Sequence, residues 1–138
     1  MAREVKLSIT GIQKAFGQED PVTLVTTGKY VHKEGTHYLF YSEFTENKEE
    51  VKNRLTITPD HVELKKSGKG ISLLKFDRMH AQPCLYQSVA GPMELVSDTK
   101  KIKITHGHTF LKMVLVYSFS MNGQPVSDYH LTMEARWD

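Results

Sequence analysis

The sequence predicts one all-β domain in which about eight to ten antiparallel strands close, or nearly close, into a meandering barrel. Three observations predict this fold: apolar and polar residues alternate with a period of two, turn residues recur at short intervals, and no segment shows convincing helical periodicity. The 138 residues, 39% hydrophobic and 25% charged, suit a single domain over residues 1–138 with one core.

The first strand is predicted from alternating apolar and polar residues, and the first hairpin from its turn residues. Residues 4–9 alternate, with Val5, Leu7 and Ile9 on one face and polar residues on the other. Lys33-Glu34-Gly35 predicts a hairpin tip that joins residues 22–32 to residues 36–46, because glycine supplies the positive φ that tight turns require.

Further turn signals divide the middle and end of the chain into short strands. These signals are Asn47 to Glu50, Pro59-Asp60, Ser67 to Gly70, Ala90 to Pro92, His106 to His108 and Asn122 to Pro125. Their spacing is typical of a meander and leaves no room for the crossover helices of a parallel sheet.

Two long strands follow near the C-terminus. Residues 129–137 alternate strictly, which predicts a strand with one wet face. Residues 110–121 carry an apolar face, and Val114 and Val116 make the opposite face half apolar as well. We therefore expect the strand over 110–121 to lie centrally in a curved sheet.

Closure of the sheet is favoured because it removes the free strand edges. An open sheet of so many strands would leave two long edges free to pair with other chains, and a barrel removes both. Periodicity does not separate a barrel from a two-sheet sandwich, so the sandwich stays open as the alternative.

Charge and cysteine content bear on partners and location. The formal net charge is +2 and basic residues are interleaved with acidic ones, which disfavours nucleic-acid binding. The single cysteine, Cys84, suits a reducing compartment, and no apolar run is long enough to span a bilayer. We expect a cytoplasmic protein that does not bind membranes.

Several short motifs resemble the YwiB-like family of small bacterial proteins over nearly the whole chain. The motifs are Gly28-x-Tyr30, Tyr41-x-Glu43, Tyr86-x-Ser88-x-x-Gly91, Tyr117 and Asn122-Gly123. The chain departs from the family pattern at Ser88, where threonine is expected, and at Pro92. The resemblance implies a lipocalin-like, or calycin-like, barrel and no assigned activity.

A candidate ligand site is centred on a carboxylate. Glu43 shares a strand face with Leu39 and Tyr41, so it points toward the barrel interior and needs a partner, for which Arg54 is the candidate. Against this, Leu55 and Ile57 indicate that the opposite face of the Arg54 strand is the apolar one. The predicted ligand-lining residues are Tyr30, Tyr41, Glu43, Arg54, Tyr86 and Tyr117.

A structural interpretation of the same residues is favoured over this ligand site. Tyrosines are ordinary sheet residues, and a Glu43–Arg54 pair can fix strand register inside the barrel or lie on its outer surface.

Other reactive residues do not form a recognisable site. His106 and His108 flank Gly107 at a spacing that a transition metal accepts, but no further ligand is adjacent, so a solvated turn is favoured. Cys84 has only His80 nearby and is interpreted as a structural thiol. We predict no catalytic residue, no metal and no cofactor.

The sequence therefore does not determine a function, and three hypotheses remain. The first is non-catalytic binding of a small apolar or amphipathic molecule in the barrel interior. The second is a protein interaction module, or a homodimer, motivated by the half-apolar face around Val114 and Val116. Its surface is an exposed strand face or the loops around Asn47 to Val51 and Gln124 to Asp128. The third, less favoured, is an enzyme with Glu43 as general base and a histidine as acid.

Overall fold

The computed structural model describes residues 2–88 and 90–138, and these form ten strands. The strands are β1 (Arg3–Ala15), β2 (Gln18–Lys33), β3 (Thr36–Phe44), β4 (Glu50–Ile57), β5 (His61–Ser67), β6 (Ile71–Asp77), β7 (Gln82–Ser88), β8 (Gly91–His106), β9 (Phe110–Met121) and β10 (Gln124–Arg136).

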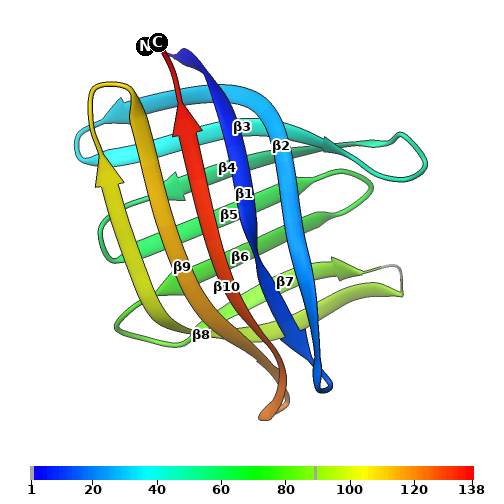
Figure 1. Ribbon diagram of the computed structural model, residues 1–138. Helices are drawn as coiled ribbons and strands as arrows, with labels where there is room; N and C mark the ends of the chain where they lie inside the picture. Colours follow the sequence, from blue (N-terminus) through cyan, green and yellow to red (C-terminus); the bar gives the residue numbers. More distant parts are fainter. Residues whose placement is uncertain (1, 89) are drawn as a thin grey trace.

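The ten strands form a closed antiparallel barrel in chain order, with β1 pairing with β10 to complete it. The predicted all-β meander barrel is confirmed, and the two-sheet sandwich is not the fold. Figure 1 shows that β1, β9 and β10 form a front layer that crosses a back layer of β3 to β7. The long strands β2 and β8 connect the two layers, because β2 pairs with both β1 and β3 and β8 pairs with both β7 and β9. The strand predicted over 110–121 is β9, which pairs with β8 and β10.

Three hairpin turns share one geometry. Phe16-Gly17, Glu34-Gly35 and Asn122-Gly123 each place two successive residues at positive φ, as in the type I′ turns that match strand twist. The hairpins at Gly35 and Gly123 were predicted. The turn at Phe16-Gly17 was not, because phenylalanine is an unusual residue at positive φ.

The barrel interior is occupied by packed side chains. Phe76, which is 2% exposed, packs against Tyr117 with ring centroids 4.3 Å apart. Tyr129 stacks on the Tyr117 ring with centroids 4.8 Å apart. Phe119 completes the cluster edge-on to Tyr117. Inward-facing residues of both layers surround these rings, so this part of the interior is a core.

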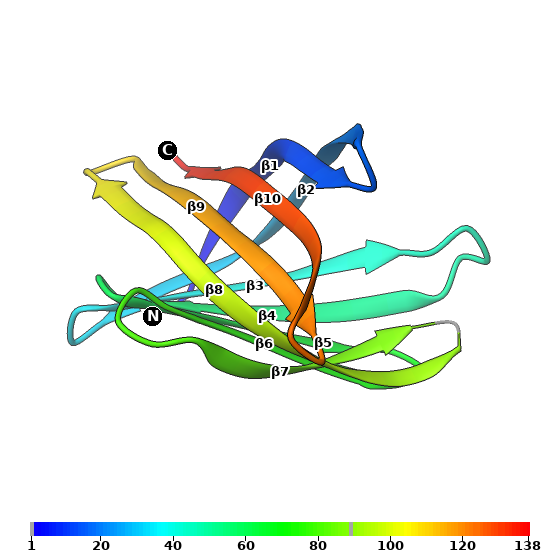
Figure 2. The same ribbon diagram turned by 90° about the horizontal axis from the view of Figure 1, so that it is seen from below.

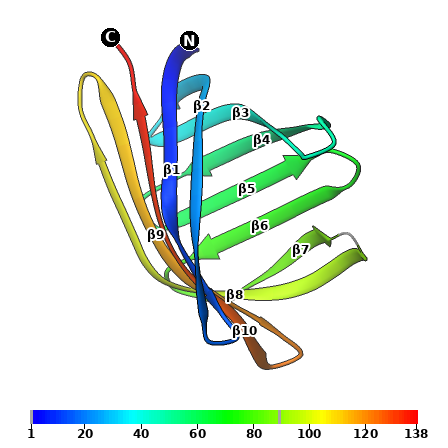
Figure 3. The ribbon, with the colours of Figure 1, turned by 45° about the vertical axis from the view of Figure 1, so that its right-hand side comes forward.

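β2 and β3 are paired over only part of their length. Their register runs from Lys33↔Thr36 to Gly28↔Tyr41, whereas residues 18–27 of β2 pair with β1 alone among the described strands. Gly28 stands where they part, and a Cβ there would lie 2.6 Å from the carbonyl oxygen of Phe40. Figure 2 and Figure 3 show that the N-terminal part of β2, before Gly28, runs away from β3.

Candidate functional site

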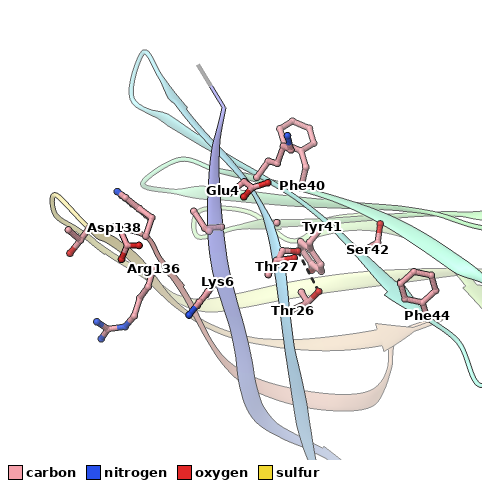
Figure 4. A pocket seen from close by; sticks show the side chains of 15 residues that line it. Glu4, Lys6, Thr26, Thr27, Phe40, Tyr41, Ser42, Phe44, Arg136 and Asp138 are labelled. Carbon is pink, nitrogen blue, oxygen red and sulfur yellow. Dashed lines mark hydrogen bonds between the residues drawn. The ribbon is translucent and has the colours of Figure 1, made fainter.

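A groove of about 920 Å³ lies at the parting of β2 and β3 and extends over β1 to the end of β10. Figure 4 shows Tyr41 beside Thr26 and Thr27 at this parting, with Phe44 further along β3. The groove is lined by Glu4, Val5, Lys6, Thr26, Thr27, Gly28, Lys29, Phe40, Tyr41, Ser42, Phe44, Thr109, Arg136, Trp137 and Asp138.

The lining combines exposed rings with charges of both signs. Phe40 is 41% exposed and Phe44 is 69% exposed, which is unusual for rings on a paired strand. Three cationic side chains and two acidic ones line the same groove; they are Lys6, Lys29, Arg136, Glu4 and Asp138. Such a surface suits a molecule with an apolar body and a polar head.

A row of polar side chains lies on the inner face next to this groove. Strand register aligns Tyr41 with Asn53, then Lys66, then Ser72 across β3 to β6. Lys66 Nζ donates to Glu43 Oε1 at 2.7 Å, so this partly buried carboxylate has a cationic partner. Asn53 is 3% exposed, and its Oδ1 accepts no hydrogen bond from the described residues.

Three of the predicted ligand residues point inward as expected and are part of the core, and Tyr41 among them also lines the groove. Tyr30, Tyr41 and Tyr117 are buried in the main hydrophobic cluster. Burial raises the pKa of all three hydroxyls, so they stay protonated at neutral pH.

The other three predicted residues do not converge. The expected partner of Glu43 was wrong: Arg54 is exposed and pairs in register with Phe40, while Lys66 takes its place. The reason is strand parity, because Asn53 and Leu55 face inward and Arg54 between them must face outward. Tyr86, near the end of β7, is also exposed, and β4, β5 and β6 separate its strand from β3, which carries Tyr41 and Glu43.

Histidines gather at another end of the barrel. His32 stacks on His37 with ring centroids 4.2 Å apart, and His106 approaches both rings edge-on at 5.5 Å and 5.0 Å. Tyr30 stacks between His37 and Trp137, and its hydroxyl is 2.6 Å from His37 Nδ1.

The electrostatics of His37 follow from this packing. Burial, followed by the charges of His32 and His106, lowers the pKa of His37 to about 4. The imidazole is therefore neutral at pH 7, and the protonated Tyr30 hydroxyl can donate to its Nδ1.

Sequence reasoning missed this cluster although a signal existed. His32 follows Tyr30 with a period of two, and His37 precedes Leu39 with the same period. With the turn at Glu34-Gly35, these positions face each other as the pair His32↔His37. The approach of His106 from β8 depends on barrel closure and has no local signal.

Neither metal binding nor thiol chemistry gains support from the geometry. Within residues 2–88 and 90–138, no three His, Cys, Asp or Glu side chains are placed to hold a metal ion. Cys84 is buried, and its Sγ accepts from the backbone N–H of Lys75 at 3.3 Å, as befits a structural thiol.

Comparisons with known proteins add a family and a fold. A family model described as a domain of unknown function, DUF1934, matches residues 7–133. The crystal structure of the ywiB protein from Bacillus subtilis matches with a TM-score of 0.86 and 19% identity, over 99% of this chain and 93% of that one. No curated protein matches. The part of the chain that the structure describes has no helix suited to crossing a membrane.

Proposed function

Since this chain belongs to the DUF1934 family, whose description names no activity, we propose its function from geometry: non-catalytic binding of a small amphipathic molecule in the groove where β2 and β3 part. The resemblance to YwiB-like proteins deduced from the motifs is confirmed by the family match and the shared fold.

The observation that carries this proposal is the pair of exposed rings, Phe40 and Phe44, inside a groove that also presents cations. Contact of the exposed rings with water is unfavourable, and a ligand that covers them lowers the free energy by removing apolar area from water. The groove replaces the barrel interior as the proposed site, because packed rings occupy the interior around Tyr117.

Two features support binding without chemistry. The 15 described residues that line the groove include no histidine, the commonest general base. Glu43, the base in the enzyme hypothesis, is engaged by Lys66 at 2.7 Å. The pair therefore supports a structural role for Glu43, next to the ligand groove.

Dodecanoate, an apolar chain with a carboxylate head, is the probe for this site. We expect binding by isothermal titration calorimetry with a Kd of roughly 10 to 100 µM. The substitution Phe44→Ser should weaken it about tenfold, because a ring that covers part of the chain is removed. Met79→Ser removes an equally exposed apolar side chain outside the groove and serves as the matched control. Equal affinities for both variants, or no heat with the unmodified protein, would refute the groove as the site.

A second function, self-association, is favoured by the unpaired edge of β2. Residues 18–27 have no described strand on the side facing β3, and Val25 on this stretch is 75% exposed. A free strand edge templates pairing with another strand, and two identical edges can pair about a twofold axis.

We accordingly propose that two copies pair through β2 and expect a dimer by light scattering coupled to size-exclusion chromatography. Val25→Lys should shift the mass to that of a monomer, because the charge would be placed in the joint edge. Ile71→Lys, on an exposed position of β6, is the control that should leave the dimer intact. A monomeric unmodified protein would rule this function out.

A further inference from the structure

A second pocket of about 400 Å³ lies over the histidine cluster, and we propose that it binds a planar aromatic carboxylate. We call it the histidine mouth, and its lining residues are Arg3, Tyr30, His32, His106, Gly107, His108 and Trp137. They come from β1, β2, β8, the turn after β8 and the residue that follows β10, so barrel closure assembles them.

The walls of the histidine mouth are flat rings held in place by packing. Trp137 stacks on Tyr30 with centroids 4.9 Å apart, and its indole Nε1–H donates to the carbonyl oxygen of His108 at 2.9 Å. His32 is held by stacking on the buried His37, and His106 stands at 72° to the His32 ring. A planar ligand ring that enters the mouth meets preformed stacking surfaces, which lowers the entropic cost of binding.

The polar groups of the mouth favour an anion. The guanidinium of Arg3 lies 5.4 Å from the centre of the Trp137 ring, and the imidazoles of His32, His106 and His108 supply N–H donors. No acidic side chain is among the described residues that line the mouth. Glu4 and Asp138 are next to Arg3 and Trp137 in sequence, but they line the groove at the parting of β2 and β3 instead.

A metal ion fits this arrangement less well than an anion. Coordination needs imidazole nitrogens that converge on one point, whereas His32 and His37 lie face to face with an interplanar angle of 13°. Parallel rings of this kind extend a stacking surface.

The Arg3 guanidinium is the fixed charge of the mouth that an anion meets. The groups that face its imidazoles are Arg3 from β1, Tyr30 from β2, His37 from β3, and His106 and His108 at the end of β8 and the following turn. The Tyr30 hydroxyl stays protonated and His37 is neutral at pH 7, so neither of them adds a charge to that of Arg3.

The probe is 2-naphthoate, with neutral 2-naphthamide as its isosteric control, both measured by calorimetry on the full chain. We expect a Kd for naphthoate of roughly 0.1 to 1 mM and at least tenfold weaker binding of the amide. Trp137 is the single tryptophan of the chain and lines both the mouth and the groove, so quenching of its fluorescence reports ligand at either site. Quenching that Arg3→Gln weakens and Phe44→Ser does not is assigned to the mouth.

Variants separate this site from the groove. Arg3→Gln and His106→Gln should each weaken naphthoate binding, Arg3→Gln by about tenfold because it removes the fixed charge. Arg54→Gln removes an exposed arginine elsewhere and should change nothing, and Phe44→Ser should affect dodecanoate only. The proposal is overturned if naphthoate and naphthamide bind alike, if Arg3→Gln leaves naphthoate affinity unchanged, or if Zn²⁺ binds at His106 and naphthoate does not.

Discussion

Phe76→Ala is expected to lower the free energy of unfolding by about 3 to 5 kcal/mol. Phe76 is fully inside the barrel and packs on both Tyr117 and Phe119, so its removal leaves a cavity as well as losing buried apolar area. Urea denaturation followed by circular dichroism measures the change.

Phe16→Ala is the matched control for this substitution. Phe16 is 93% exposed at the β1–β2 turn, so its truncation should change the free energy of unfolding by less than about 0.5 kcal/mol. A small effect of Phe76→Ala would mean that the barrel contains a ligand cavity there, and the interior would become the proposed binding site again.

Acid is expected to destabilise the protein through His37 by roughly 2 to 3 kcal/mol between pH 7 and pH 4. The pKa of His37 is lowered from 6.5 in the unfolded chain to about 4 in the fold. Above pH 6.5 the imidazole is neutral in both states and contributes nothing to pH dependence. As the pH falls below 6.5, only the unfolded state takes up the proton, so stability is lost progressively until the folded state is protonated near pH 4.

His37→Gln isolates this effect from the titration of carboxylates. Glutamine keeps a hydrogen-bonding group near Tyr30 but takes up no proton in this range. The variant is less stable at pH 7 because it loses the stacking on His32, and this deficit should shrink or reverse on acidification. A difference between the two proteins that stays constant from pH 7 to pH 4 would contradict the lowered pKa.

Local sequence patterns were sufficient to predict most of the architecture. The alternation in residues 129–137 and the glycines at positions 35 and 123 predicted strands and turns that the structure contains. Each of these signals acts within a few residues, since side-chain direction alternates along a strand and glycine permits positive φ. The turn at Phe16-Gly17 was not predicted, because phenylalanine, its first residue, has no turn preference.

The candidate sites were predictable only in part. The inward direction of Tyr41 and Glu43 follows from their spacing with Leu39, and the exposure of Arg54 follows in the same way from Leu55. The partner of Glu43 did not follow, because Lys66 is two strands away and its position depends on two successive registers.

The sequence by itself determined an antiparallel meander with a core face and a wet face. Tertiary structure alone decided where β2 leaves β3, how the groove at Tyr41 opens, and that His106 meets His32 and His37. The physical reason is the sequence separation over which each effect acts. Alternation and turn conformation are set by neighbouring residues. Register and closure, in contrast, sum weak pairings over strands far apart in the chain.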